Sequence, residues 1–564
     1  MTMSGFRQEG AICSTTEYYN LGSFKLDITT KSEDAQVWFN RGLTWAYAFN
    51  HEESAICFEQ AIAHDNSCAM AYWGLAFALG PNYNKPWETF DEIDLKTTVL
   101  RTYKASRQAK EHAANATTLE QALIDAIQFR YPCDDLVKDY STQDRAYADA
   151  MDSVYKQHPY SLDVATLYAD AMMNLTPWKL WDLHTGNPGT GARTLKIKSV
   201  LESSLAQDGA FQHPGLLHMY IHCIEMSPNP ELGLNAADHL RDLIPDAGHL
   251  RHMPSHLDIL IGDYRRAIAS NYDAIIVDEK FLTLSGSNNF YTFYRLHDYH
   301  SLIYAAMFAG QSKIALQIVA RMEASLPETL LRVSSPPMAD WLETYMSVRV
   351  HVLIRFGMWQ DIIQMEFPID RQLYCVTMAM LHYAKGVAYA ATFKVQEAEK
   401  ERSLFRSAVE QVPATRQEYP NKCVDILAVG AAMLDGEIEY RRENYKEAFA
   451  SLRKSIELSD RLIYCEPWGW MQPPRHAYAA LMLEQGHVEE AAIVYSADLG
   501  VDGMLPRAHQ HPNNVWALQG YHECLTRLGR EAEARLIEPQ LKLALAIADV
   551  PVKASCFCRL DSSS

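Results

Sequence analysis

The chain has 564 residues, of which 48% are hydrophobic and 21% are charged, and its formal net charge at pH 7 is −19. This composition is typical of a globular protein with a large core, and the acidic balance argues against nucleic acid or an anionic membrane surface as the main partner. We see no apolar run long enough to cross a membrane and no signal-peptide pattern, so we expect a soluble, cytoplasmic protein. None of the eleven cysteines forms a CxxC pair, which argues against a zinc ribbon or a thioredoxin-type site. Their odd number in a large chain favours buried, reduced thiols in a reducing compartment.

Apolar residues recur every three or four positions along most of the chain, which predicts helices. The first clear helical hairpin is WFNRGLTWAYAFNHEESAICFEQAIAHD, residues 38–65, with Gly42 on its first helix and Phe58 and Ala61 on its second. Small residues at such positions let two helices approach closely, as in a tetratricopeptide repeat.

Residues 85–210 fit the repeat poorly. They include LTPWKLWDLHTGNPGTGART, residues 175–194, in which prolines, glycines and tryptophans lie between helical segments. A loop of this length and aromatic content is either a plain connection between two hairpins or the wall or lid of a pocket. Both interpretations stay open.

Two histidine-rich runs follow. In HPGLLHMYIHCIE, residues 213–225, His218 and His222 are four apart, so they share one helix face about 6 Å apart, and Glu225 lies one turn further along that edge. Helical metalloproteins direct two imidazoles and a carboxylate at one ion in this way. The alternative for each histidine is an ordinary surface or hydrogen-bonded core residue.

The second run is HLRHMPSH, residues 249–256, where His252 and His256 repeat the spacing of four. Pro254 favours a first helical turn, which places His252 at or just before a helix start. His213 and His249 each precede one pair. We therefore expect the metal ligands to come from the set His213, His218, His222, His249, His252 and His256.

The twelve-residue offset recurs further along the chain, in most cases between small residues. It appears in the pairs Ser255 and Ala267, Ile303 and Ala315, Gly386 and Ala398, Gly436 and Ala448, and Gly520 and Ala532. Leu452 and Leu536, four residues after Ala448 and Ala532, are predicted as core positions on the second helices of their hairpins. Turn formers precede charged helix starts in GDYRRA, NYKEA, GHVEEA and GREAEA. We predict an all-α fold, a superhelical array of antiparallel helical hairpins.

The chain also resembles a family of tetratricopeptide-repeat-like proteins of bacteria and fungi. The resemblance covers about residues 36–320 and rests on FNHEESAICFEQA, DVATLYADAMMNLTPW, AGHLRHMPSHLDILIGDYRRAIASN and HDYHSLIYAAMFAG, together with the HPGxxHxYIHxxE and HMPSH runs. It implies the fold and leaves the chemistry open. We predict an N-terminal extension (1–34), a His-rich repeat domain (35–330), C-terminal repeats (331–548) and a flexible tail (549–564).

An imidazole-rich site with a carboxylate suits a divalent transition metal such as iron, copper or zinc. Three ligands such as His218, His222 and His256 would leave open coordination positions, and a pair of coppers held by two histidine triads is a further option. Glu225 could be a ligand, a general base or the acceptor that orients an imidazole, and we name Tyr220 with it as a catalytic candidate.

The leading hypothesis is a metal-dependent oxidoreductase or oxygenase acting on a small organic substrate, an aromatic compound or secondary metabolite among the options. One alternative is a non-catalytic module that binds a protein or peptide, with a structural metal or none. A second is a metal-dependent hydrolase or lyase. We expect no nucleic-acid or membrane partner and leave a homodimer open.

Overall fold

The computed structural model describes residues 18–560, which form two compact units. Unit 1 contains residues up to 257 together with 272–295, and unit 2 contains residues 258–271 together with those from 296 onwards. Most of the predicted N-terminal extension lies outside the described residues. The predicted boundaries at residues 34, 330 and 548 stay a prediction.

The first helices all belong to unit 1. They are α1 (Glu33–Tyr47), α2 (His51–His64), α3 (Ala69–Leu79), α4 (Glu92–His112), α5 (Thr118–Arg130), α6 (Ser141–Gln157), α7 (Leu162–Met173), α8 (Thr194–Leu205), α9 (Pro214–Glu225), α10 (Leu234–Leu240) and α11 (Gly248–His252). Three helices then carry residues of both units: α12 (Pro254–Ile261), α13 (Tyr264–Ser285) and α14 (Tyr291–Phe308).

The remaining elements belong to unit 2. They are α15 (Ser312–Ala324), α16 (Glu328–Leu331), α17 (Met338–Leu342), α18 (Val348–Arg355), α19 (Trp359–Gln364), α20 (Cys375–Ala391), α21 (Val395–Val409), the strands β1 (Gln417–Glu418) and β2 (Asn421–Lys422), α22 (Cys423–Arg441), α23 (Tyr445–Asp460), α24 (Pro474–Glu484), α25 (Val488–Asp498), α26 (Val515–Arg527) and α27 (Glu531–Ile547). Within residues 18–560, β1 and β2 are the only strands, and they pair as a short antiparallel hairpin.

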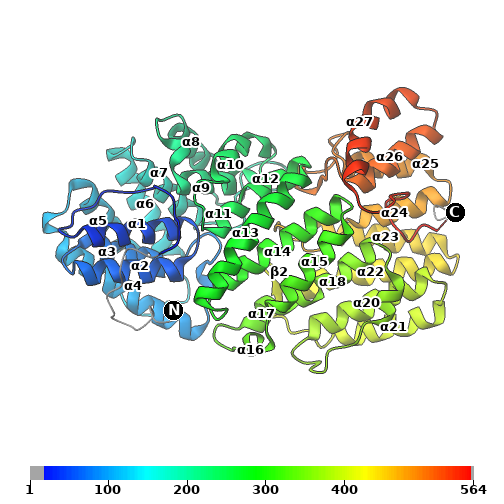
Figure 1. The fold of residues 1–564 in the computed structure, drawn as a ribbon, viewed down its shortest axis with the longest axis horizontal. Coiled ribbons are helices and arrows are strands. Elements are labelled where there is room, and N and C mark those ends of the chain that lie inside the picture. Colours follow the sequence, from blue (N-terminus) through cyan, green and yellow to red (C-terminus); the bar gives the residue numbers. More distant parts are fainter. Residues whose placement is uncertain (1–17, 561–564) are drawn as a thin grey trace. The chain divides into compact units, whose positions relative to one another are not determined.

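Helices that follow one another in the chain pack side by side in each unit. In unit 1 the most extensive packing is between α1 and α2, and in unit 2 between α20 and α21 and between α22 and α23 (Figure 1). This arrangement confirms the predicted all-α class and the array of helical hairpins. No helix in the described part of the chain combines the length and apolar character needed to span a membrane.

One turn geometry recurs in the hairpins. In many of them a residue with positive φ stands two positions before the second helix; these residues are Phe49, Gly262, Gly310, Gly357, Phe393, Glu443, Gly486 and Gly529. Glycine adopts this left-handed conformation without strain, whereas Phe, Glu and other L-residues do so at a cost. Phe49 and Phe393 are therefore unusual occupants of this position.

In most of these hairpins the predicted residue on the first helix lies seven positions before the residue with left-handed φ. Gly436 lies seven residues before the left-handed Glu443, and a Cβ added to Gly436 would stand 2.7 Å from Leu452 Cγ. Ala448 and Leu452 are 0% and 1% exposed, as expected for the facing helix. The close approach predicted from Gly436 and Ala448 is confirmed.

The prediction for the last hairpin was wrong in register. Leu536, expected in the core, is 76% exposed, and the buried small residue of α27 is Ala534 in place of Ala532. The residue with left-handed φ here is Gly529, which follows Gly520 by nine positions instead of seven. The predicted small residue, Ala532, therefore lies two positions before the buried one. A Cβ on Gly520 would instead meet the ring of Tyr495 on α25.

The end of the chain, where we expected a flexible tail, makes contacts with unit 2 over its described residues. Asp549 accepts hydrogen bonds from the backbone N–H and the hydroxyl of Ser312, at 2.7 and 2.8 Å. Cys556 and Cys558, to which we assigned no role, form a disulfide, while the other described cysteines are free. Cys13 lies outside the described residues.

Candidate metal centre

The His-rich runs form a buried group of side chains in unit 1. Helix α9 is central to this region, since it contacts α1, α7, α8 and α10 and every one of its residues is buried. Pro214 occupies its first turn, a position where the missing N–H has no consequence. Gly215 allows the close approach, because a Cβ there would stand 2.6 Å from the ring of Tyr47 and 2.9 Å from Thr166.

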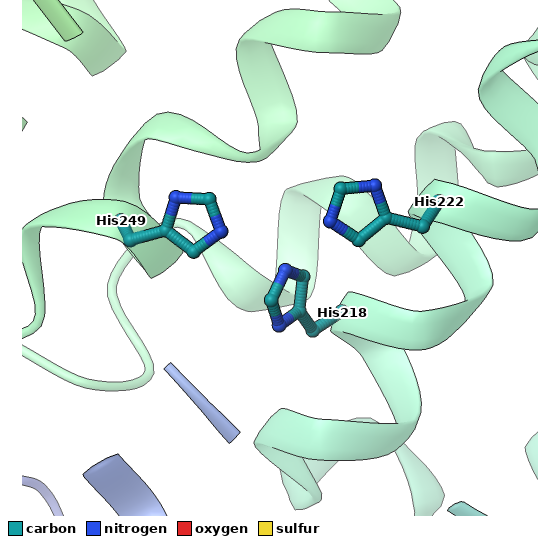
Figure 2. A group of neighbouring side chains, drawn as sticks. All are labelled: His218, His222 and His249. Carbon is teal, nitrogen blue, oxygen red and sulfur yellow. The ribbon is translucent and has the colours of Figure 1, made fainter. Parts of the chain in front are cut away.

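Three imidazoles converge from two helices. His218 and His222 come from α9 and His249 from α11, and one ring nitrogen of each lies within 4.8 Å of the others. Figure 2 shows the three rings turned toward a shared space. All three side chains belong to residues that are 0–1% exposed. Ligand nitrogens of a tetrahedral zinc ion are roughly 3.3 Å apart, so small ring rotations would bring these atoms to ligating distance.

The hydrogen bonds of His218 and His222 fix their tautomers. Nδ1 of His218 is 2.6 Å from the carbonyl oxygen of Tyr47, and Nδ1 of His222 is 2.8 Å from Glu225 Oε1. Because a carbonyl and a carboxylate oxygen accept, each Nδ1 carries the proton and each Nε2 holds a lone pair. Neither Nε2 has a hydrogen-bond partner, although both atoms are buried. Metal-ligating histidines are commonly oriented in this way, by a carbonyl or a carboxylate on the second nitrogen.

Glu225 connects the two histidine runs. Its Oε1 accepts from His222 and its Oε2 accepts from Nδ1 of His256, so one buried carboxylate binds imidazoles on α9 and α12. Nε2 of His256 is then an acceptor, 2.7 Å from Nε2 of His252, which must donate. Nδ1 of His252 lies 3.4 Å from the Ser255 hydroxyl, the donor that this tautomer requires. His256 is thus hydrogen-bonded to both Glu225 and His252.

Burial keeps the imidazoles on α9 uncharged. Desolvation lowers the pKa of His222 to about 3 and lowers the pKa of His218 well below its usual value, with the neighbouring His222 contributing in the second case. At neutral pH both rings are therefore neutral, the form that binds metals.

The ring of Phe49 covers the three imidazoles. Its centroid is 4.4 Å from that of His218, and it stacks on His222 at 5.7 Å and on His249 at 5.6 Å. The left-handed backbone at Phe49, with φ 55°, directs the chain between α1 and α2 at this point. Tyr83 adds a further ring at 5.1 Å from His222. An apolar shell of this kind excludes water and strengthens electrostatic interactions inside it.

Two of the predicted site residues lie elsewhere. His213 is the N-cap of α9: its Nδ1 accepts from the backbone N–H of Leu216 at 3.0 Å, and its Nε2 is 3.1 Å from Asp163. The Tyr220 hydroxyl donates to Glu202 on α8 at 3.1 Å. Both ring nitrogens of His213 are therefore engaged away from the group that His218 joins.

The structure adds residues that the sequence reasoning missed, namely Phe49, Tyr47 and Tyr83. The only local signal was Phe49 at a hairpin turn where glycine is usual. No spacing rule links Tyr47 or Tyr83 to a helix more than 130 residues away in the chain. The loop predicted as a connection or a pocket wall contributes Trp178, whose ring is 6.4 Å from that of His222.

No protein-family model and no curated protein matches the chain. Among solved structures it is similar to the APC/C hetero-tetramer Cut9–Hcn1, with 13% identity, a TM-score of 0.30 and coverage of 84% of this chain and 74% of that one. It is also similar to Naa15/Naa10 bound to HypK-THB, with 13% identity, a TM-score of 0.23 and coverage of 90% and 70%. For the yeast Tom70 the identity is 12%, the TM-score 0.28 and the coverage 83% and 85%.

Proposed function

We propose that the protein is a helical-repeat binding module whose unit 1 holds one transition-metal ion through His218, His222 and His249. The observation that carries this proposal is the pair of buried, unpartnered Nε2 atoms on His218 and His222. A buried polar atom without a partner costs about 1–3 kcal/mol, and an ion at the shared point of the rings would use both lone pairs. Zinc, copper and iron all suit a set of imidazole ligands.

Charge and burial favour a structural role for this ion. The ligands are 0–1% exposed, so an ion bound to them would be enclosed by the protein, which favours a structural ion over one that exchanges substrate with solvent. The Glu225 carboxylate, bonded to His222, offsets part of the positive charge of a divalent ion. The ion would hold α9 against α11, and the surrounding hairpins would present a surface to a protein or peptide partner.

Metal analysis tests this proposal. Chain purified without an affinity tag of histidines should contain close to one equivalent of metal by emission spectrometry, and His218→Ala with His222→Ala should abolish it. His213→Ala is the matched control, because it removes a histidine of the same run that caps α9: it should retain the metal and lose about 0.5–2 kcal/mol of stability. A chain that contains no metal, and whose melting temperature does not change on adding zinc, copper or iron, would overturn the proposal.

A second candidate function is a metal-dependent oxidoreductase acting on a small organic molecule. The observation that favours it is the ligand number, since three neutral imidazoles leave coordination positions open, and rings of Phe49 and Tyr83 surround them. Oxygen uptake by the iron- or copper-loaded chain in the presence of simple phenols tests it. Uptake that is lost in His222→Ala would support catalysis, and uptake equal to that of free metal would exclude it.

A further inference from the structure

A separate cleft of about 570 Å³ opens in unit 1, away from the histidine runs. Its walls come from the connection between α3 and α4, the start of α6 and the loop after α7. This loop is the segment for which we kept two interpretations, a plain connection or the wall of a pocket. The volume lies in the range of small-molecule sites. None of the six histidines discussed above lines it.

An unsatisfied acceptor lies in this cleft. Asn174, the C-cap of α7, lines the cleft and is 7% exposed. Its Nδ2 donates to the backbone oxygen and the Oδ1 atom of Asp170, at 2.8 and 3.1 Å, which fixes the orientation of the amide. Its Oδ1 is buried and has no hydrogen-bond partner. A ligand bound there would therefore have to offer an N–H or O–H donor.

Behind this acceptor two buried carboxyl groups, Asp144 and Asp170, share one buried guanidinium, that of Arg130. Asp144 lines the cleft, accepts from Nε1 of Trp87 at 3.2 Å and lies 3.7 Å from Nε of Arg130, and Oδ1 makes both contacts. Asp170 has a buried Oδ2 without a partner. Burial raises the pKa of Asp144 and raises the pKa of Asp170 to about 6, and the Arg130 guanidinium counteracts part of the rise in both groups. A positively charged ligand group would relieve this imbalance.

One wall of the cleft is aromatic. The rings of Trp87 and Tyr140 stack with centroids 4.3 Å apart and planes 19° apart, and both residues line the cleft. At the rim, Arg145 is exposed and Arg193 is paired with Asp149 at 2.7 Å. An anionic ligand would have to bind at this rim, whereas a donor would bind deeper, at Asn174.

We propose that this cleft binds a small organic amine in its ammonium form. The ammonium donates to Asn174 Oδ1 and to the Asp144 carboxylate, and the apolar part of the ligand lies against Trp87 and Tyr140. Ammonium has several donors and can donate to both the Asn174 amide oxygen and the Asp144 carboxylate, whereas an alcohol has one donor and a carboxylate has none.

Calorimetric titration of the full chain with three probes of similar size tests this proposal. 2-Phenylethylamine should bind about tenfold or more tightly than 2-phenylethanol or 3-phenylpropanoate, because a charge-assisted hydrogen bond replaces a neutral one or a repulsion. Asp144→Asn and Asn174→Ala should each weaken amine binding about tenfold. Arg145→Ala is the matched control from the rim of the same cleft, and it should leave amine binding unchanged or stronger.

Three results would overturn the proposal. They are equal or tighter binding of the alcohol or the carboxylate, amine binding that neither Asp144→Asn nor Asn174→Ala changes, and the absence of binding by any of the three probes. Circular dichroism of each variant establishes that it is folded, and Asn174→Ala serves alone if Asp144→Asn does not fold. Chelator should not alter amine binding, so this outcome is independent of the metal centre.

Discussion

At the scale of single residues, Phe49 combines an unfavourable backbone with a central position. It is 4% exposed, holds φ at 55° and lies against three imidazoles, whereas Phe393 occupies the same turn position with φ 59° and is 69% exposed. The backbone cost is thus similar at the two positions, and the burial of the ring differs. We infer that packing of the Phe49 ring over the histidines offsets the strain.

Phe49→Ala should lower the free energy of unfolding by about 3 kcal/mol or more, as truncation of a buried aromatic ring does. Phe393→Ala is the matched control and should change it by less than about 0.5 kcal/mol. Urea unfolding followed by circular dichroism measures both. Equal effects of the two substitutions would show that the ring of Phe49 is not held by its contacts with the imidazoles.

Glu225 joins His222 on α9 to His256 on α12 through hydrogen bonds to its carboxylate. The negative charge of this carboxylate is the property that would favour a bound metal ion. If unit 1 binds a metal as proposed, Glu225→Gln should weaken binding about 10- to 100-fold, because an outer carboxylate orients the ligand imidazole and increases its basicity. Competition with a chromophoric chelator measures the affinity. Glu202→Gln, on α8, removes a carboxylate that accepts from Tyr220 and should have no effect. An unchanged affinity in Glu225→Gln would argue against this role.

At the scale of elements, the small hairpin of β1 and β2 carries a carboxyl group with an unusual environment. Burial raises the pKa of Glu418 on β1 to about 8, and Nδ1 of His300 is 3.9 Å from its Oε1. The folded chain therefore keeps a proton that the unfolded chain releases above its ordinary pKa of about 4.3. The stability from this group is present at low pH and is lost as the pH rises toward 8.

Glu418→Gln should remove this pH dependence. Between pH 5 and pH 8 the variant should gain stability relative to the wild type, by at most about 1.4 kcal/mol per pH unit. Urea unfolding of both proteins across this range measures the difference. A difference between variant and wild type that does not change with pH would contradict the assignment.

At the scale of the whole molecule, the division into two compact units has a consequence for ligand-linked stability. All three proposed ligands, His218, His222 and His249, lie in unit 1. A ligand that binds only the folded form stabilises it by about 2.7 kcal/mol at a hundred times its dissociation constant. We therefore expect bound metal to stabilise unit 1 selectively.

Hydrogen exchange followed by mass spectrometry tests this expectation. On adding metal to the chelator-treated chain, peptides covering α9 and α11 should gain protection, and peptides covering α20–α27 should not. The double variant His218→Ala with His222→Ala is the control and should show no gain. Equal protection across both units would mean that the metal acts elsewhere or that the chain unfolds as one unit.

The sequence by itself was sufficient for the local features. Apolar spacing predicted helices, because the period of a helix is a property of neighbouring residues. The same spacing brought His218 and His222 to one face with Glu225, and Pro254 predicted the start of α12. The hairpin turns at Gly262 and Gly486 were also readable. The register of α27 was not, since two additional residues before Gly529 shift its buried face.

Only the tertiary structure decided which local faces meet. His249 groups with His218 and His222, whereas His256 groups with His222 and Glu225. Phe49 enters the site from a turn far away in the sequence, and Trp87, Asp144 and Asn174 come together from three separate segments. Contacts of this kind depend on how helices pack against one another, through close approaches such as that of Gly215, and a spacing rule within one helix contains no information about them.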